Sequence, residues 1–265
     1  MSPTGKVYLV GAGPGAPDLL TLRAARLLER ADIVLHDALV HPDTLALAVN
    51  ARRVDVGKRY GKVSTEQRFI HRALIEAART HAVVVRLKGG DPMMFGRAQE
   101  EIEALEEAGI EYEVVPGVTA ALAAASTLRT SLTRRGVART VAFLTPRVGR
   151  GETASRWLPA ALGADSAVLY MAAGASQSIA TDLIAAGKPA TTPVALVESA
   201  TLAEEKRLFT TLSHLAAEAL PRASGPVVMC VGEVFGAKKR SDPRLRGADK
   251  AGPGRDDIPP IALTA

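Results

Sequence analysis

The chain's most chemically informative stretch is a pair of glycines followed by an aspartate, Gly89-Gly90-Asp91, which ends a β-branched run. Adjacent glycines after a buried strand let a ligand or another backbone segment approach closely. Asp91 adds a hydrogen-bond acceptor beside the rigid Pro92, and an apolar patch follows at residues 93–95. This combination is typical of a binding loop at the carboxyl end of a parallel strand, where open α/β sheets bind ligands. An ordinary strand-to-helix turn is the alternative.

A second glycine-rich loop, GAGPG at residues 11–15, follows an apolar run and precedes a helical pattern. Together with Ala16 it satisfies the loose dinucleotide pattern G-x-G-x-x-G/A, and Asp37 stands where a ribose-binding acid is expected. A nicotinamide-dependent oxidoreductase is therefore a serious alternative. Two features weaken it: Pro14 removes a backbone donor where the pyrophosphate requires one, and the loop at Gly89-Gly90 is the better glycine loop.

These loops need a globular scaffold, and the composition supplies one. The 265 residues are 47% hydrophobic and 23% charged, which describes a chain with a substantial core. The longest apolar runs, such as residues 120–125, fall far short of the roughly 20 residues that span a bilayer. The first residues show no basic segment followed by an apolar h-region, so we expect a cytoplasmic protein with no membrane partner.

Charge and metal-binding residues narrow the function further. Of the net charge of +5, residues 236–265 contribute +3, from seven basic and four acidic residues. Basicity that lies mostly in a tail argues weakly against nucleic-acid binding, which requires a basic face within the fold. Cys230, the only cysteine, lies in a strand-like run and is expected to be a small buried thiol. The five histidines show no metal-ligand spacing, and we expect no metal site.

Strand-like runs alternate with helical patterns along the first half of the chain. This rhythm predicts a mainly parallel sheet with helices on both faces. Leucines at helical spacing indicate the first helix, and Ser64 with Gln67 forms a capping signal for the third. The predicted strands are residues 7–10, 33–35, 53–56, 82–87 and 112–115, and the predicted helices are residues 17–30, 42–49, 64–80 and 99–108.

The rhythm restarts after the turn at Pro116-Gly117, which predicts a second domain. We place the boundary between residues 116 and 135 and assign residues 1–118 and 119–235 to the two domains. The tail at residues 236–265 lacks periodicity and is expected to be largely disordered. The predicted strands of the second half are residues 140–144, 167–171, 193–197, 207–211 and 227–231, and its predicted helices are residues 119–127, 176–186 and one beginning at Leu212 or Ser213.

Several long motifs occur in order and at matching spacing, and together they carry a specific resemblance. Over residues 5–235 the chain resembles the uroporphyrinogen-III C-methyltransferases, which belong to the tetrapyrrole methylases. The motifs are VGAGPG at residues 10–15, PDLLTL at 17–22, HDALV at 36–40, GKR at 57–59, RLKGGD at 86–91, PGVTA at 116–120, YM at 170–171, PVALVE at 193–198 and VGEV at 231–234.

The resemblance implies a tetrapyrrole methylase-like fold of two α/β domains, usually in a homodimer, with a cofactor cleft between them. It implies that S-adenosylmethionine binds folded in this cleft, rather than at the first glycine loop as a dinucleotide would, and leaves as S-adenosylhomocysteine. Glycines and soft methionine walls suit such a ligand. The positions that match the cofactor contacts of the family are Pro14, Gly89, Gly90, Asp91, Met94, Thr119, Ala120, Met171 and Ala200.

The resemblance also implies the reaction, which converts uroporphyrinogen III to precorrin-2 by methylating ring carbons 2 and 7. This product leads to sirohaem and cobalamin. The catalytic carboxylate of the family matches Asp37, and its proton donor matches Lys58; a polar strand end and a solvated loop are the alternatives. The tetrapyrrole substrate carries eight carboxylates, for which arginines are suited bidentate partners. The candidate arginines are Arg59, Arg97, Arg134 and Arg135.

The chain departs from the family pattern at several positions. Residue 16 is alanine instead of aspartate, residue 93 is methionine instead of phenylalanine, and Ala98-Gln99 replaces a glycine pair. Larger changes affect residues 132–136 and 145–147, near the expected substrate side. A methylase of a later corrin precursor, an RNA or protein methylase and a non-catalytic binding protein therefore remain alternatives.

Overall fold

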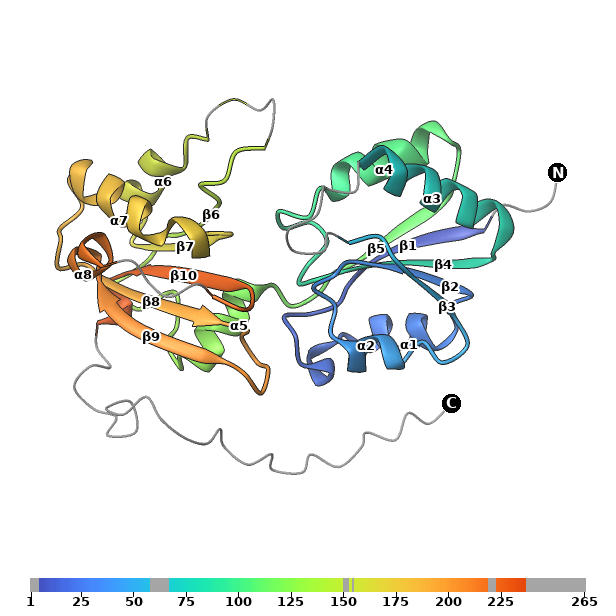
Figure 1. Ribbon diagram of the computed structural model, residues 1–265, viewed down its shortest axis with the longest axis horizontal. Coiled ribbons are helices and arrows are strands. Elements are labelled where there is room, and N and C mark those ends of the chain that lie inside the picture. The colour runs from blue at the N-terminus through green and yellow to red at the C-terminus, as the bar shows by residue number, and fades with distance from the viewer. Residues whose placement is uncertain (1–4, 58–66, 150–152, 154, 219–222, 237–265) are drawn as a thin grey trace.

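The computed structural model describes residues 5–57, 67–149, 153, 155–218 and 223–236. It contains two five-stranded sheets, each covered by helices on both faces, and the sheets lie side by side in the molecule (Figure 1). No helix in these ranges is long and apolar enough to cross a membrane. The tail predicted at residues 236–265 lies outside the described residues except for Gly236.

The first sheet is entirely parallel, as the alternating pattern predicts, with strand order β3-β2-β4-β1-β5. The predicted strand at residues 112–115 matches its bounds, and the other four differ by one or two residues. Because β4 is central, its carboxyl end opens between those of β1 and β2. The strands are β1 (Lys6–Gly11), β2 (Ile33–His36), β3 (Arg52–Asp55), β4 (Val83–Lys88) and β5 (Tyr112–Val115).

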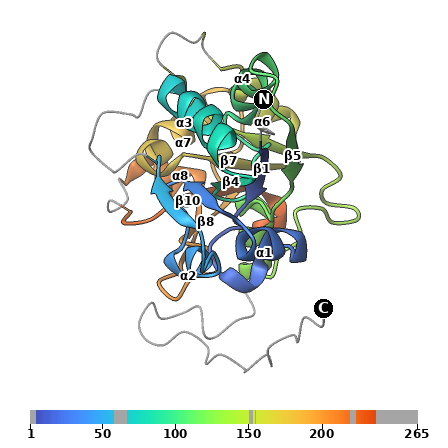
Figure 2. The same ribbon diagram turned by 90° about the vertical axis from the view of Figure 1, so that its right-hand side faces the viewer.

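Two pairs of helices cover opposite faces of this sheet (Figure 2). The helices α1 (Leu22–Glu29) and α2 (Pro42–Ala46) cover one face, and α3 (Gln67–Thr80) and α4 (Ala98–Glu107) cover the other. The predicted helix at residues 17–30 is divided into a 3-10 turn (η1, Pro17–Leu19) and α1, because Thr21 caps α1 by accepting a hydrogen bond from the Ala24 N–H at 3.2 Å. The predicted Ser64 cap lies outside the described residues.

The second sheet is mixed rather than mainly parallel, with strand order β6-β7-β10-β8-β9. Only β6 and β7 are parallel, while β10 enters between β7 and β8 and pairs with both in antiparallel orientation. The strands are β6 (Val141–Leu144), β7 (Ser166–Tyr170), β8 (Pro193–Glu198), β9 (Lys206–Thr211) and β10 (Val227–Gly232). The rhythm of strands and helices does not distinguish these orientations, because apolar runs look alike in both.

Helices also cover both faces of the second sheet (Figure 1). The helix α5 (Ala120–Thr127) packs on one face with the short η3 turn (Glu233–Phe235). The helices α6 (Trp157–Gly163), α7 (Ser176–Ala185) and α8 (Leu212–Ala217) pack on the other, and a short η2 turn (Ala173–Ala175) precedes α7. The helix α6 is not among the helices predicted from the sequence. Because α5 shares a core with the second sheet, we propose that the domains divide at residues 118 and 119.

Candidate functional site

The two glycine loops are joined through their backbones at the carboxyl end of the first sheet. Gly13 and Gly90 exchange hydrogen bonds, with N–O distances of 3.2 and 2.7 Å, and the Ala12 N–H donates to the Lys88 carbonyl at 2.7 Å. Gly90 has a φ of +70°, which an L side chain rarely adopts. The loop after β1 and the loop after β4 therefore form one rigid unit.

Gly117, in the turn after β5, also packs against this unit. A Cβ atom on Gly11 would lie 2.6 Å from the Cα of Gly117, so the turn after β5 packs directly on the first loop. Asp91 ties the same turn to its own loop: Oδ2 accepts from the Gly117 N–H at 2.9 Å, and Oδ1 accepts from the Met93 N–H at 2.8 Å. Both carboxylate oxygens thus hold backbone groups, a structural role beside the predicted contact with a cofactor.

The second domain meets the glycine loops at Thr119 and Ala120. The Cβ that Gly90 lacks would lie 3.9 Å from the Thr119 Cα and 4.0 Å from the Ala120 nitrogen, so these predicted cofactor residues lie close together. The Thr119 and Tyr170 hydroxyls are hydrogen-bonded at 2.6 Å, and the Ala121 N–H donates to the Tyr170 hydroxyl at 3.2 Å. Burial raises the pKa of the Tyr170 phenol, and these hydrogen bonds oppose the shift.

The loop after β1 also contacts the segment that holds Ala200. The Ala16 N–H donates to the Thr201 Oγ1 at 3.1 Å. A Cβ on Gly15 would lie 2.8 Å from the Leu202 Cγ and 3.2 Å from the Ala200 carbonyl oxygen, which leaves no room for a side chain there. Pro14, in the same loop, is half-buried. The predicted residues Pro14 and Ala200 therefore lie on segments that touch across the junction between the domains.

Strained backbone gathers around this junction. Among the described residues with positive φ other than glycine are Phe95 (+53°), Met171 (+56°), Ser199 (+51°) and Thr201 (+72°). The Phe95 ring also lies against the Tyr170 ring, with centroids 4.9 Å apart, which is a further contact between the domains. Met171 is 45% exposed, and Met94, one residue before Phe95, is half-buried. Such strain persists only where the surrounding structure imposes it, and it is concentrated at functional sites.

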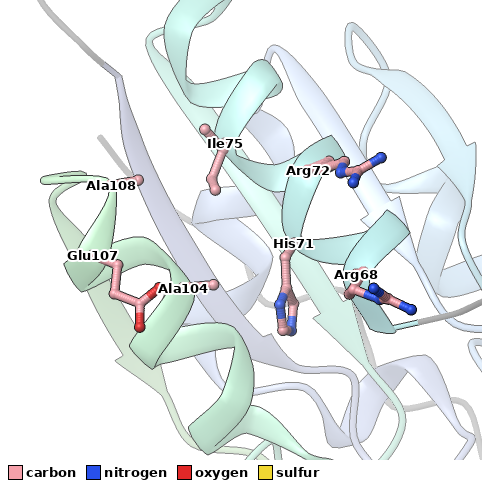
Figure 3. Close-up of a pocket in the computed structure, with 7 residues that line it drawn as sticks. All are labelled: Arg68, His71, Arg72, Ile75, Ala104, Glu107 and Ala108. Carbon is pink, nitrogen blue, oxygen red and sulfur yellow. The ribbon is translucent and has the colours of Figure 1, made fainter.

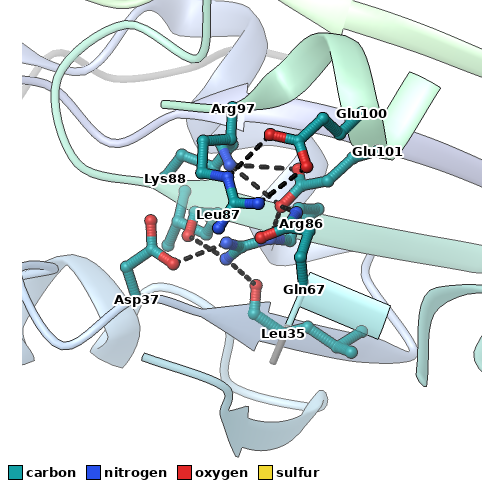
Figure 4. Close-up of polar contacts among 9 residues, drawn as sticks. All are labelled: Leu35, Asp37, Gln67, Arg86, Leu87, Lys88, Arg97, Glu100 and Glu101. Carbon is teal, nitrogen blue, oxygen red and sulfur yellow. Dashed lines mark hydrogen bonds and ion pairs between the residues drawn. The ribbon is translucent and has the colours of Figure 1, made fainter. Parts of the chain in front are cut away.

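Asp37, the predicted catalytic residue, follows β2 and reaches toward β4. Its Oδ1 accepts a hydrogen bond from the Arg86 guanidinium at 2.5 Å. The Asp37 side chain is 29% exposed, whereas that of Arg86 is only 2% exposed. In the described part of the chain, the Asp37 Oδ2 accepts no hydrogen bond. Arg86 thus holds one Asp37 oxygen, and the other points away from Arg86 (Figure 4).

Arg86 belongs to a buried charge cluster of Asp37, Arg86, Lys88 and Glu101 (Figure 4). The Arg86 Nε donates to the Glu101 Oε1 at 3.1 Å, and the Lys88 Nζ contacts both Glu101 oxygens at 3.0 Å. Burial, aided by the Arg86 guanidinium, lowers the pKa of the Lys88 ammonium, while Glu101 and Asp37 oppose this shift. The four formal charges sum to zero, which makes their burial tolerable.

The remaining predicted residues divide into two groups. Lys58 and Arg59 lie outside the described residues, so their placement stays a prediction. Arg97 makes a bidentate ion pair with Glu100, with Nε–Oε1 and Nη2–Oε2 distances of 2.7 Å. Arg134 and Arg135 are exposed on a tight turn. Of the three arginines in the described part of the chain, only Arg97 forms a bidentate pair with a carboxylate.

The geometry argues against the nicotinamide alternative. In the first loop the Ala12, Gly13 and Ala16 N–H groups already donate to Lys88, Gly90 and Thr201, respectively. A pyrophosphate site requires free N–H groups and an adjoining helix amino end. Here Pro14 has no N–H, and α1 begins only at Leu22. The N–H groups of this loop therefore bind the loop after β4 and Thr201 rather than a pyrophosphate.

Two further features lie apart from this junction. A shallow hollow between α3 and α4 contains none of the predicted site residues (Figure 3); it is lined by Arg68, His71, Arg72, Ile75, Ala104, Glu107 and Ala108. Cys230 is buried in β10, as expected, and burial raises the pKa of its thiol to about 12. The described residues contain no group of three His, Cys, Asp or Glu side chains that would hold a metal ion.

Several residues that support the site were not predicted from the sequence. Tyr170 links α5 to Phe95, Thr201 joins the second domain to the first loop, and Arg86, Lys88 and Glu101 hold Asp37. A signal for the charge cluster was present: two basic residues alternate in the run VVVRLK of β4, whose other residues are apolar. Such residues on a buried strand require buried partners.

Comparison with known proteins identifies the class. The model of the tetrapyrrole (corrin/porphyrin) methylases matches residues 6–216. The chain belongs to this family, and the resemblance expected from its motifs is confirmed, as is the α/β fold.

Three similar proteins show how far the likeness extends. A uroporphyrinogen-III C-methyltransferase of Pseudomonas aeruginosa is 43% identical over 87% of this chain and 94% of its own length. A siroheme synthase of Azotobacter vinelandii is also 43% identical over 87% of this chain, which spans only 50% of that longer protein. The crystal structure of a uroporphyrin-III C-methyltransferase of Thermus thermophilus complexed with S-adenosylhomocysteine superimposes with a TM-score of 0.77 at 42% identity, over 87% of this chain and 98% of that one.

Proposed function

We propose that this chain is an S-adenosylmethionine-dependent C-methyltransferase that converts uroporphyrinogen III to precorrin-2. Methylation falls on ring carbons 2 and 7, and the product leads to sirohaem and cobalamin. The observation that carries the proposal is the junction of Gly90 with Thr119 and Ala120, in a chain 43% identical to a uroporphyrinogen-III C-methyltransferase over nearly all of that relative. The proposal covers this methylation alone and not the other steps of the longer siroheme synthases.

The residues at the junction fit this cofactor. Bound S-adenosylmethionine supplies an electrophilic methyl group. Gly90 leaves open the space beside Thr119 and Ala120 that a Cβ would fill, and its positive φ disfavours any residue with a side chain. The exposed Met171 adds a soft apolar surface. The residues proposed to hold the cofactor are Pro14, Gly89, Gly90, Asp91, Met94, Thr119, Ala120, Met171 and Ala200.

The chain's own part in the chemistry is alignment and charge stabilisation. A methyl transfer requires the nucleophilic carbon to be held in line with the methyl group and shielded from water. As a pyrrole carbon attacks, its ring nitrogen gains positive charge. We propose that the Asp37 oxygen not bound by Arg86 accepts the nitrogen's proton or stabilises that charge; the partial exposure of the side chain supports this role. Lys58 is the proposed proton donor.

The tetrapyrrole substrate carries carboxylates that the protein must bind. We propose that Arg59, Arg97, Arg134 and Arg135 are the arginines that pair with them, since guanidinium binds carboxylate bidentately. Arg97 already forms this type of pair with Glu100, which the substrate would have to displace or share.

We also propose that the protein is a homodimer in the cytoplasm. The family resemblance supports the dimer, and light scattering of the purified chain measures it.

The decisive experiment incubates the protein with uroporphyrinogen III and methyl-labelled S-adenosylmethionine and follows the product by mass. We expect two labelled methyl groups per tetrapyrrole. A parallel reaction with precorrin-2 as the substrate tests the alternative of a later corrin methylase. Label transferred to precorrin-2 and not to uroporphyrinogen III would replace the proposed substrate, and label transferred to neither would contradict the activity.

A further inference from the structure

Arg86 of the first sheet lies beside Asp37, and its guanidinium contacts the Asp37 carboxylate. It lies in the central strand β4, paired in register with Leu35 of β2, and Asp37 follows Leu35 by two residues. Because side chains alternate along a strand, Arg86 projects to the face that also carries Leu35. The guanidinium therefore meets the Asp37 carboxylate from within the core, on the side opposite to solvent.

Every nitrogen of the Arg86 guanidinium is engaged. Nε donates to Glu101, Nη1 donates to the Leu87 carbonyl at 3.2 Å and lies 3.5 Å from that of Leu35, and Nη2 donates to Asp37 (Figure 4). The planar fork is thus fixed in the core. Among these partners, only Asp37 has a partly exposed side chain. The fixed guanidinium therefore restricts the position of the Asp37 carboxylate.

Glu101 fixes Arg86 in turn. Its Oε1 also accepts from the Lys88 ammonium at 3.0 Å and from the Gln67 amide at 3.4 Å, and its side chain is only 1% exposed. Buried ion pairs contribute little net stability, because desolvation offsets their attraction. A cluster that places three buried charges under a single partly exposed carboxylate is therefore better explained by positioning than by stability.

We propose that Arg86, held by Glu101 and Lys88, is a positioning residue that fixes the Asp37 carboxylate for methyl transfer. The proposal rests on the catalytic role proposed for Asp37. A misplacement of about 1 Å can slow a reaction roughly a hundredfold. Loss of Arg86 should therefore slow methyl transfer through Asp37 and leave the cofactor side, built from backbone at the glycine loops, unchanged.

A double-mutant cycle tests this. Arg86→Met, Asp37→Asn and the double variant are compared by kcat with uroporphyrinogen III, and by the calorimetric Kd of S-adenosylhomocysteine. We expect kcat to fall roughly tenfold to a hundredfold in each single variant. In the Asp37→Asn background, Arg86→Met should cost less than about threefold, because its target is already lost. The Kd should change less than about twofold in all variants.

Two further variants keep the result interpretable. Arg86→Met leaves Glu101 paired with Lys88, but Arg86→Lys repeats the cycle with the cluster's charge intact and should restore part of kcat. Lys188→Met is the matched control: it removes a half-buried ammonium that donates to the Ala161 and Ala164 carbonyls, far from Asp37 in sequence and in the other domain, and should keep normal kcat.

The outcomes separate this proposal from the proposed function. Losses that multiply in the double variant, or a normal kcat for Arg86→Met, would overturn the positioning role and leave Asp37 as a catalytic residue. A normal kcat for Asp37→Asn would overturn both, since Arg86 could not then act through it.

Discussion

Gly90→Ala separates a binding loop from a simple turn, because the structure defines what the added methyl group would meet. Gly90 has a φ of +70°, and both its N–H and its carbonyl are hydrogen-bonded to Gly13, so the backbone cannot relax into another conformation. The new Cβ would lie 3.9 Å from Thr119 and 4.0 Å from Ala120, with nothing closer. The added methyl group therefore fits in the protein alone, but it would occupy space that the proposed cofactor needs.

Two different free-energy costs follow. Alanine in the left-handed region costs on the order of 1 kcal/mol of folding free energy, which lowers Tm by roughly 2–4 °C in a chain of this size. A methyl group forced into a filled site costs about 1–3 kcal/mol of binding free energy. This corresponds to S-adenosylhomocysteine binding that is weaker by roughly fivefold to 150-fold. The larger Gly90→Val change should abolish binding while the protein remains folded.

Gly109→Ala is the matched control. Gly109 ends α4 with a φ of +66° and has nothing within 4 Å of the position of its Cβ. Thermal unfolding should show the same loss for both alanine variants, whereas calorimetric titration should show weaker S-adenosylhomocysteine binding only for Gly90→Ala. Unchanged binding by Gly90→Ala would mean that the loop at Gly89-Gly90 is merely a turn, and the cofactor site would have to lie elsewhere.

Two other predictions follow from the same geometry. S-adenosylhomocysteine should bind in calorimetry while NAD and NADP give no heat, because the N–H groups of Ala12, Gly13 and Ala16 are already engaged; binding of NAD alone would restore the oxidoreductase alternative. Hydrogen bonds from the Arg139 and Thr140 N–H groups lower the pKa of the Asp165 carboxyl, so its stabilising effect is present above the unfolded pKa and disappears as the pH falls. The Tm difference between wild type and Asp165→Ala should therefore shrink below a pH of about 4, and a difference that is constant with pH would contradict this.

The sequence predicts the order of elements well because that order depends on local periodicity. Most strands are found within one or two residues, and the parallel first sheet follows from helices alternating with strands. Orientation in the second sheet was not predictable in this way. β10 inserts between β7 and β8 through contacts distant in sequence, and a buried antiparallel strand has the same apolar composition as a parallel one. The helix α6 is short and contains Pro159, so its periodic signal is weak.

The site was predictable to the extent that its residues carry local signals. The glycines and Asp91 stand out by type and spacing, and the structure brings Gly90 together with Thr119 and Ala120. What no local pattern reveals is that Gly13 pairs with Gly90 or that Ala16 binds Thr201, since these contacts join segments 77 and 185 residues apart. Such contacts depend on how the two sheets are placed, and this placement is a property of the whole fold.

The cofactor side of the proposed site consists mainly of backbone and the substrate side of side chains, and this difference affects specificity. The cofactor side consists largely of backbone: glycines packed on one another, hydrogen bonds between loops and left-handed residues. The substrate side consists of charged side chains, with Asp37 above its buried partners and Arg97 beside Glu100. Side chains can be exchanged without altering the fold, whereas this backbone arrangement cannot. The departures at residues 132–136 and 145–147 should therefore affect which tetrapyrrole is methylated, while leaving the choice of methyl donor unchanged.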